Sequence, residues 1–487
     1  MKIDLEKIRS ALSSKGLLAG VRGNLPVEAA GISDDSRTVE RGGLFIAVRG
    51  SSGDGHEFLG AAAERGATCA IVEDPERTQL PALVVTKGRE AAALAAATAY
   101  GAPASSLILV GVTGTNGKTT TTSILRHLLD DGNETSASIG TLGVLLGSGG
   151  TVLPGGGGLT TPGPVELQRL LRSLVNNGVR TVAMEVSSHS LDQRRVDGIE
   201  FNTAVFTNLT RDHLDYHGTM EAYLAAKARL LDYLKPGAAV VVNADAPEWR
   251  SLHPSRPPLT FSVTGPADVR AAGVRFTPFG SEWQLVHGAE SHDVRLPLIG
   301  DVNVQNALAA AAAALSLGIP LSTIATRLHS VPQVPGRLEV ISTRPTVLRD
   351  YAHTPDALER ALATARDFTS GKLIVVFGCG GDRDKGKRPL MGQIAEKGAD
   401  TVIVTSDNPR TEDPDRIIDE IESGMSASKH LRVTDRHAAI ERAIHAARDG
   451  DIVLLAGKGH ETYQIRGTVS YPFDEKEIVK EITRSHR

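Results

Sequence analysis

Apolar and polar positions alternate along the chain in a way that predicts repeated strands and helices from the start. In residues 1–105, short apolar runs rich in β-branched residues predict strands, and residues 56–67 carry the pattern of a helix. The predicted strands are residues 44–48, 68–73 and 82–86. We therefore expect residues 1–105 to form a small α/β domain that ends in a linker at residues 101–106.

The second part of the chain, residues 106–332, begins with its strongest element. The apolar run 107–110 predicts a buried strand, glycines interrupt it, and a helical pattern starts at Thr119. Further strand, loop and helix patterns follow, including a predicted strand at residues 181–191. Residues 147–164 are so rich in glycine that we expect no regular element there.

The third part, residues 333–487, follows a joint rich in proline and glycine. Apolar strands alternate with helices, and each strand ends in a polar or glycine-rich loop. This pattern predicts a doubly wound, Rossmann-like parallel sheet. Three of its loops are charged, at residues 380–388, 406–410 and 457–461. Because the carboxyl ends of parallel strands share one edge of a sheet, we expect these loops to gather there.

The glycines after residue 110 have the spacing of a phosphate-binding loop. Glycines let backbone N–H groups face an anion, and the helix that follows adds the positive end of its dipole. Lys118 would then reach the β and γ phosphates of a nucleotide, and the Thr119 hydroxyl would contact Mg²⁺. The strict motif is not met, because Val112 stands where its first glycine belongs. A glycine turn before an ordinary helix is the alternative.

Size and composition exclude several classes of protein. A chain of 487 residues favours two to four domains. A net charge of −4 gives no sign of a polyanion-binding surface, so nucleic acid is not an expected partner. No apolar run is long enough for membrane insertion, and no signal peptide is evident. Cys69 and Cys379 are too far apart for a C-x-x-C motif. We expect a cytoplasmic protein.

Several polar residues stand out, each with an ordinary alternative. Glu185 falls at the end of an apolar run in the predicted strand 181–191. Phosphate-loop enzymes place a carboxylate for Mg²⁺ on such a strand, but Glu185 could also face solvent. His213 could bind a metal or simply be hydrogen-bonded. The spacing alone predicts that Lys227 is an ordinary lysine on a helix, with its charge exposed to solvent. Asn303 and Asn306 share one helix face and could cap the helix or touch a nucleotide.

Taken together, the motifs make the chain resemble the Mur ligase family, the ATP-dependent ligases that build the peptidoglycan stem peptide. In chain order they are GVTGTNGKTTT, TTPGP, MEVSSHSLDQRRV, FTNLTRDHLDYHGTMEAYLAAK, NVQNALAA, PGRLE, DYAHTPDAL, GCGGDRDKGKRP, SDNPR and GKGHE. The resemblance covers nearly the whole chain. It implies three domains, at residues 1–105, 106–332 and 333–487, for the UDP end of the substrate, for ATP and for the incoming amino acid.

The resemblance also implies roles for individual residues. For catalysis these are Lys118, Lys227, Glu185 and His213. For ATP they are Gly114, Thr115, Asn116, Gly117, Lys118, Thr119, Thr120, Asn303, Asn306, Arg337 and Asp350. For the UDP-muramoyl peptide they are Ser36, Thr160, Thr161, Ser187, Gln193 and Arg195. For diaminopimelate they are Arg383, Asp407, Asn408, Pro409, Arg410, Gly457 and Glu461.

The resemblance further implies a reaction and its cofactors. ATP would activate the D-glutamyl side-chain carboxylate of UDP-N-acetylmuramoyl-L-alanyl-D-glutamate as an acyl phosphate, and meso-2,6-diaminopimelate would attack it. Two Mg²⁺ ions are implied, held by Thr119, Glu185, His213 and Lys227. The lysine would act as a carbamate (N6-carboxylysine) formed with CO₂. The resemblance also implies that the protein is a monomer. It further implies a role in cell-wall synthesis, and hence in cell shape, cell division and the cell cycle.

The physical chemistry of the charged loops bears on which amino acid is used. Diaminopimelate has an ammonium and a carboxylate at both ends, whereas lysine has no distal carboxylate. The guanidinium of Arg410 offers two parallel donors to a carboxylate. Asp407 and Asn408 beside it could accept from an ammonium. A buried arginine without a partner is costly, so we expect lysine to be rejected.

Other functions share parts of this pattern. A phosphate-loop kinase or nucleotide switch would use the glycine loop but not the C-terminal arginine loops. A non-catalytic binding protein would not need Glu185, His213 and Lys227 together. Within the ligases, the rivals are an enzyme that adds lysine and one that adds a dipeptide.

Overall fold

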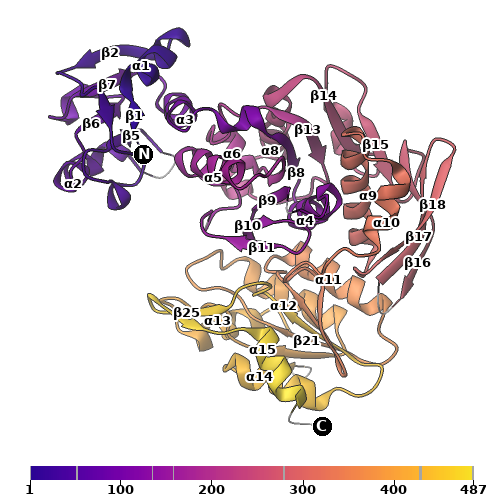
Figure 1. Ribbon diagram of the computed structural model, residues 1–487. Coiled ribbons are helices and arrows are strands. Elements are labelled where there is room, and N and C mark those ends of the chain that lie inside the picture. The colour runs from indigo at the N-terminus through magenta and orange to yellow at the C-terminus, as the bar shows by residue number, and fades with distance from the viewer. Residues whose placement is uncertain are drawn as a thin grey trace. The chain divides into compact units, whose positions relative to one another are not determined.

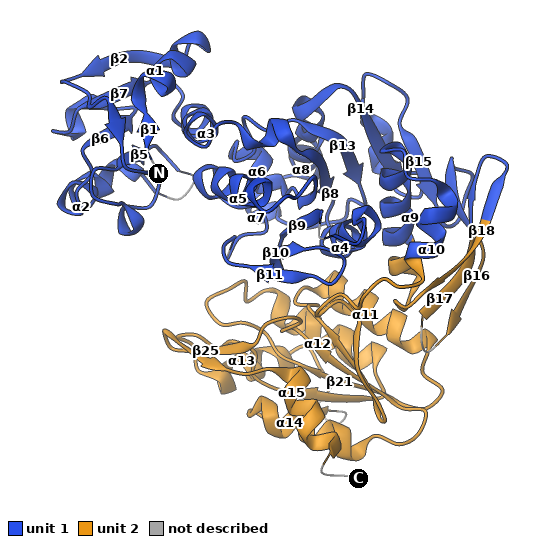
Figure 2. Cartoon of the chain, in the orientation of Figure 1, with its two compact units in different colours: residues 1–271, 285–291, 305–327 blue, residues 272–284, 292–304, 328–487 orange. Residues whose placement is uncertain are grey.

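The computed structural model describes residues 2–50, 53–133, 135–156, 158–277, 280–426 and 430–484. The chain divides into two compact units, shown in blue and orange in Figure 2. The first unit comprises residues 1–271, 285–291 and 305–327. The second comprises residues 272–284, 292–304 and 328–487. Each unit is described by itself below.

The N-terminal part of the first unit is an α/β fold built on a five-stranded sheet, as the apolar pattern predicted. Its strand order is β2 (Leu18–Arg22), β7 (Ala82–Val85), β6 (Cys69–Val72), β5 (Leu44–Ala47), β4 (Ile32–Ser33). β4 to β7 are parallel, and β2 is antiparallel to β7. The helices are α1 (Leu5–Ser14), α2 (Leu59–Glu64) and α3 (Gly88–Ala99). The predicted helix 56–67 begins as the 3-10 turn η2 (Gly55–Phe58).

Both faces of this sheet are covered, which explains why β5, β6 and β7 are apolar without alternation. Ile46 of β5 packs in one apolar core with Ile8 of α1, whereas its neighbour Phe45 packs in another core with Leu59 of α2. Successive side chains on a strand point to opposite faces. A small two-stranded sheet, β1 (Ile3–Asp4) with β3 (Glu28–Ala29), completes this part.

The central sheet has β8 (Ile108–Thr113) between the parallel strands β12 and β13, so the glycine loop leaves from its middle. The full order is β11 (Thr151–Leu153), β10 (Gly143–Leu146), β9 (Ser136–Gly140), β12 (Thr181–Glu185), β8, β13 (Phe201–Phe206), β14 (Leu234–Asn243), β15 (Leu259–Ser262), β16 (Val269–Thr277), β17 (Gly280–His287), β18 (Glu290–Leu296). The helices of this stretch of the chain (Figure 1) are α4 (Lys118–Leu129), α5 (Pro164–Asn176), α6 (Ser188–Asp192), α7 (Leu214–His217), α8 (Met220–Ala228), α9 (Asp301–Ser316) and α10 (Leu321–Leu328).

Two local predictions for this region were wrong. The glycine-rich segment 147–164 does contain a regular element, β11, which pairs antiparallel with β10. Backbone hydrogen bonds to a neighbouring strand hold it, and these do not depend on side chains. The predicted strand 181–191 stops at Glu185, after which α6 begins with Ser187 as its N-cap.

The C-terminal sheet of the second unit is doubly wound, which confirms the predicted fold class. Its order is β19 (Glu339–Thr343), β20 (Thr346–Asp350), β24 (Ile452–Ala456), β21 (Leu373–Phe377), β22 (Thr401–Val404), β23 (His430–Arg432). All strands except β19 are parallel. One apolar core joins the sheet to α11 (Pro355–Asp367), α12 (Lys387–Gly398) and α13 (Pro414–Glu422). A second joins it to α14 (Arg436–Ala446) and α15 (Glu475–Arg484).

A two-stranded hairpin extends from this unit after the loop that follows β24. It consists of β25 (Tyr463–Arg466) and β26 (Val469–Pro472), paired antiparallel. Among the described helices of the whole chain, none has the length and apolar character needed to span a membrane.

Candidate functional site

The loop between β8 and α4 adopts conformations that only glycine tolerates well. Gly114 has φ +145° and Gly117 has φ +85°. A Cβ at Gly114 would collide with Thr207 Oγ1, and one at Gly117 would collide with Asn306 Oδ1. The two glycines are therefore required both by backbone conformation and by close packing. The packing also brings Asn306, predicted for the nucleotide site, against the loop.

Two lysines converge on one carbonyl oxygen of this loop. Lys118 Nζ donates to Gly114 O at 2.8 Å, and Lys227 Nζ donates to the same oxygen at 2.7 Å. Lys227 is 1% exposed and lies 4.5 Å from the centre of the Tyr223 ring. The prediction from spacing alone, that the Lys227 side chain is exposed to solvent on its helix, was therefore wrong.

This environment changes the acidity of Lys227. Burial holds the pKa of its ammonium well below the ordinary range, and the nearby charge of Lys118 acts in the same direction. Asp212 opposes this shift but does not reverse it. A lysine with a lowered pKa has more of its amine uncharged near neutral pH, and only the uncharged amine is nucleophilic.

Glu185, at the carboxyl end of β12, is fully enclosed. It is 1% exposed, so the alternative of a solvent-facing glutamate is excluded. The backbone N–H of Thr141 donates to Oε1 at 2.8 Å, and the Thr141 hydroxyl donates to Oε2 at 3.2 Å. Thr141 was missed by sequence reasoning. It directly follows β9, a strand that sequence reasoning did not predict.

The residues assigned to the muramoyl peptide lie around Glu185. Thr161 Oγ1 donates to the backbone oxygen of Glu185 at 2.9 Å and accepts from the N–H of Ser187 at 3.1 Å. Thr160 Oγ1 lies 3.3 Å from Thr141 Oγ1. Segments that are 19 to 26 residues apart in sequence therefore meet at the end of β12.

Gln193 and Arg195 extend the same network. Arg195 Nη1 donates to the backbone oxygen of Thr161 at 3.0 Å, and its Nη2 donates to Gln193 Oε1 at 2.6 Å. Gln193 Nε2 in turn donates to the Tyr216 hydroxyl at 3.2 Å. Burial lowers the pKa of the Arg195 guanidinium, which nevertheless stays cationic at neutral pH.

His213 lies at the start of α7 in a left-handed conformation, with φ +52°. Its side chain is 46% exposed, and Nε2 is 3.4 Å from a carboxylate oxygen of Asp212. The His189 ring, which sequence reasoning missed, lies 4.8 Å from the His213 ring. Burial lowers the pKa of His189 to about 4, so it is neutral at pH 7. Among the described residues, no group of three or more His, Cys, Asp or Glu has metal-binding geometry.

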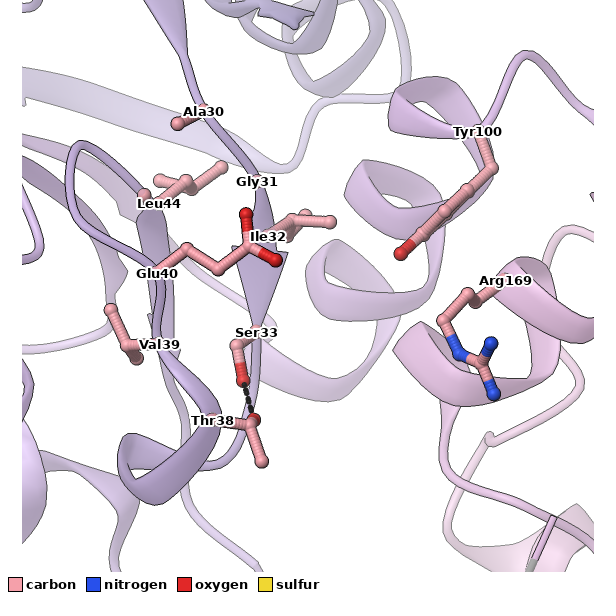
Figure 3. A pocket seen from close by; sticks show the side chains of 11 residues that line it. Ala30, Gly31, Ile32, Ser33, Thr38, Val39, Glu40, Leu44, Tyr100 and Arg169 are labelled. Carbon is pink, nitrogen blue, oxygen red and sulfur yellow. Dashed lines mark hydrogen bonds between the residues drawn. The ribbon is translucent and has the colours of Figure 1, made fainter. Parts of the chain in front are cut away.

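Ser36 begins the 3-10 turn η1 (Ser36–Thr38) beside a cavity of about 250 Å³ in the first unit (Figure 3). Thr38, at the end of this turn, lines the cavity, and its hydroxyl is 2.8 Å from Ser33 Oγ. Tyr100 and Arg169 line the cavity from the opposite side. Ser36 itself is not one of the lining residues.

The other nucleotide candidates have local roles in the second unit. Asn303 Nδ2 donates to the backbone oxygen of Ile299 at 2.8 Å, which ties α9 to the chain before it. Asp350 accepts from the N–H of Leu338 at 2.7 Å. The Arg337 guanidinium lies 4.9 Å from the centre of the Tyr351 ring. Arg337 and Asp350 thus belong to one neighbourhood, at the start of the C-terminal sheet.

The three charged loops of the second unit meet at the carboxyl edge of its sheet, as predicted. Asn408 Nδ2 donates to Glu461 Oε2 at 2.8 Å, which joins the loops after β22 and β24. The N–H of Gly381 donates to the backbone oxygen of Asn408 at 2.9 Å, which adds the loop after β21. Lys458, fully buried and missed by sequence reasoning, donates to both Asn408 Oδ1 and Glu461 Oε2 at 3.1 Å.

These contacts decide which oxygens can receive an ammonium. Asn408 Oδ1 already accepts from Lys458 and from the N–H of Ile465, at 2.9 Å for the latter, so its two lone pairs are used. Asp407 Oδ2 is buried and has no hydrogen-bond partner among the described residues. A Cβ at Gly457 would lie 2.8 Å from this oxygen, so the glycine leaves space beside it. The structure favours Asp407 over Asn408 as the acceptor.

The two arginines predicted to bind diaminopimelate differ in exposure. Arg410 is half-buried, has φ +52° and donates from Nη1 to Gly381 O at 2.8 Å. Its guanidinium keeps further N–H donors for a carboxylate. Arg383 is exposed and donates to Asp382 O at 3.0 Å. The expectation of a buried arginine is therefore met only in part.

Three family models match the chain in succession. Residues 28–106 match "Mur ligase family, catalytic domain", residues 112–314 match "Mur ligase middle domain", and residues 336–459 match "Mur ligase, glutamate ligase domain".

Curated relatives and solved structures match over almost the full length. UDP-N-acetylmuramoyl-L-alanyl-D-glutamate–2,6-diaminopimelate ligase of Geobacillus kaustophilus is 45% identical over 92% of this chain and 93% of its own. The same-named enzyme of Synechococcus elongatus is 46% identical over 93% of each chain. A solved structure of a ligase with this name covers 100% of both chains, with 34% identity and a TM-score of 0.68. MurF of Thermotoga maritima in complex with ADP, 21% identical over 93% of this chain and 97% of its own, shares the fold with a TM-score of 0.64.

Proposed function

This chain belongs to the Mur ligase family of ATP-dependent ligases, and we propose that it adds meso-diaminopimelate to UDP-N-acetylmuramoyl-L-alanyl-D-glutamate. The amide would form at the D-glutamyl side-chain carboxylate, in the synthesis of the peptidoglycan precursor. The observation that carries the choice of amino acid is that one turn presents both the Arg410 guanidinium and a carboxylate oxygen of Asp407 that has no hydrogen-bond partner among the described residues. Such a pair suits one carboxylate and one ammonium of the same end of diaminopimelate.

The first chemical step activates an unreactive carboxylate. An oxygen of the D-glutamyl carboxylate attacks the γ-phosphorus of ATP, the bond to the bridging oxygen breaks, and ADP leaves. The product is an acyl phosphate. Lys118, at the N-terminus of α4, would disperse the charge that develops on the transferred phosphoryl group. Gly114 and Gly117, both with positive φ, allow a loop conformation in which backbone N–H groups can face the phosphates.

Magnesium fits the chemistry of the residues around Glu185. Mg²⁺ prefers oxygen ligands and usually takes several of them from water and from substrate phosphates. The enclosed Glu185 carboxylate, the Thr119 hydroxyl and His213 would hold the ions, with Lys227 as a carbamate. Bound Mg²⁺ would neutralise charge on the phosphates. The small number of protein carboxylates here is typical of a site that is completed by ATP.

The environment of Lys227 supports its modification by CO₂. Its lowered pKa leaves the amine uncharged more often than a solvated lysine would be. The amine nitrogen would attack the carbon of CO₂, an N–C bond would form and a proton would leave. The product carries a negative charge close to Lys118. A buried carbamate beside an ammonium is less costly than two ammonium groups on one carbonyl oxygen.

The second step forms the amide. The uncharged amine of diaminopimelate attacks the acyl carbon, the resulting tetrahedral intermediate expels phosphate, and the amine loses a proton. Asp407 and Glu461 would bind the one ammonium group that does not react, and Arg410 would bind a carboxylate. We assign the UDP end of the other substrate to the turn at Ser36 and its muramoyl peptide to Thr160, Thr161, Ser187, Gln193 and Arg195.

One assay tests this proposal against its rivals. The purified protein is given ATP, Mg²⁺ and UDP-N-acetylmuramoyl-L-alanyl-D-glutamate, together with diaminopimelate, lysine or D-alanyl-D-alanine. ADP release should depend on the UDP substrate and on diaminopimelate. Equal release with lysine would reject the choice of amino acid. Release without any amino acid would instead favour a kinase or nucleotide switch.

Replacing Arg410 with alanine should weaken binding of diaminopimelate. A charge-assisted hydrogen bond contributes about 1.5 to 3 kcal/mol, so KM for diaminopimelate should rise roughly 10- to 100-fold. Activity with lysine, which has no distal carboxylate, should change much less. The ratio of kcat/KM values for diaminopimelate and lysine measures the effect.

Arg416 offers a matched control for this variant. It lies on α13, a few residues further along the chain, and is exposed. Arg416→Ala removes the same charge but should leave both substrates unaffected. Unchanged kinetics of Arg410→Ala with diaminopimelate would reject the role of Arg410.

A further inference from the structure

We infer that Gln464 is a positioning residue for the incoming amino acid, because it fixes the turn 406–410 from the hairpin formed by β25 and β26. The inference rests on the proposed function of that turn. Gln464 itself contacts none of the oxygens or donors left for the ligand. It acts through the backbone that carries Asp407 and Arg410.

Gln464 is an uncharged polar side chain that is almost fully enclosed, at 1% exposure. Its Nε2 donates to Ser406 Oγ at 3.0 Å and to the backbone oxygen of Asp407 at 2.6 Å. Both N–H groups are thereby used on the turn. A buried amide that lost these partners would pay the cost of desolvation without compensation.

The orientation of this amide is fixed independently. Arg466 donates from Nε at 3.0 Å and from Nη2 at 2.8 Å to Gln464 Oε1. A guanidinium can only donate, so the atom that it contacts must be the amide oxygen. The NH₂ group therefore has to face the turn.

The same hairpin holds the turn at its other end. The N–H of Arg410 donates to Ile465 O at 3.1 Å, and the N–H of Gly467 donates to Arg410 O at 2.7 Å. The backbones of Arg410 and Arg466 pair as an isolated parallel β-bridge. The N–H of Ile465 also donates to Asn408 Oδ1 at 2.9 Å.

These contacts matter because the turn is held in a conformation that its sequence does not favour. Arg410 has φ +52°, in the left-handed region that residues with a Cβ disfavour. Such conformations persist only where surrounding contacts determine them. This backbone conformation determines the direction in which the Arg410 side chain points, and hence whether its guanidinium can reach a carboxylate. Loss of the Gln464 contacts should allow the turn to relax.

The decisive variant is Gln464→Glu. Glutamate has nearly the same size and still accepts from Arg466, but it places an oxygen against Asp407 O where the amide donated. We expect KM for diaminopimelate to rise about tenfold, which corresponds to the loss of one buried hydrogen bond. The KM values for ATP and for the UDP substrate should not change. A residue needed only for folding would not move one KM alone.

Two further variants complete the test. Val469→Ala shortens a side chain that is 51% exposed on the same hairpin and should leave all three KM values unchanged. Ser406→Ala removes only one acceptor of Gln464 and should raise KM for diaminopimelate by a smaller factor. If Gln464→Glu does not fold, as judged by circular dichroism and Tm, Ser406→Ala decides the question.

The outcomes separate this inference from the proposed function. If the unaltered protein shows no ADP release that depends on diaminopimelate, the proposed function fails. If the unaltered protein is active but KM for diaminopimelate is unchanged in Gln464→Glu and Ser406→Ala, the inference is overturned. An equal rise of all three KM values would also overturn it.

Discussion

Replacing Lys227 with alanine is expected to abolish ligation, with a fall in kcat of roughly 10³-fold. The side chain is buried and its pKa is well below the ordinary range, so it is suited to react with CO₂ and to present a carboxylate near the phosphate loop. Alanine cannot do this. The fold should persist, since among the described residues the side chain makes one hydrogen bond, to Gly114 O. Ligation is measured as ADP release that depends on both other substrates, and folding as Tm.

A small carboxylate should partly restore the activity of Lys227→Ala. Added acetate is expected to occupy the space left by the side chain and to supply the oxygens that the carbamate would provide. In the unaltered protein, labelling with ¹³CO₂ should give a carbamate carbonyl signal in the NMR spectrum, and this signal should be absent from the variant. Full activity of Lys227→Ala without acetate would contradict the assignment.

Replacing Lys118 with alanine should also abolish ligation, for a different reason. Phosphoryl transfer depends on cations that neutralise charge on the transferred group, and one such group contributes roughly 10³-fold or more to kcat. Lys118 is placed for this by the loop, where it donates to Gly114 O and Thr115 O, both at 2.8 Å. Phosphate oxygens would replace these carbonyl oxygens as acceptors. Turnover under saturating substrates measures the loss.

The two lysine variants serve as controls for each other. Acetate should not rescue Lys118→Ala, because an anion cannot replace an ammonium. Lys235→Ala is a matched control for the removal of a lysine from the same unit, since Lys235 also donates to backbone, at 3.4 Å to Leu107 O, but lies outside the proposed site. Its turnover should be unchanged. Rescue of Lys118→Ala by acetate would contradict the distinct roles of the two lysines.

The amino-acid sequence alone was enough to predict the local elements that carry the chemistry. The run from residue 107 to Thr119 predicted strand, glycine loop and helix, and the structure has β8, the loop and α4 in that order. The alternating pattern of the C-terminal part predicted a parallel doubly wound sheet with its charged loops at one edge. These features follow from hydrogen bonds and side-chain periodicity within a few residues, so a linear pattern records them.

The tertiary structure decided which polar side chains are enclosed and by what. Lys227 reads as a solvated charge on its helix, and only the packing of α8 against a loop more than a hundred residues earlier buries it on Gly114 O. Thr141 holds Glu185 across 44 residues of sequence, and Gln464 holds the turn at Asp407 across 57. Spacing along the chain does not encode such contacts, because they arise only when distant segments pack together and buried polar groups must find partners. The sequence therefore predicted the candidate site residues and the loops that carry them. The residues that hold these side chains in place were determined only by the tertiary structure.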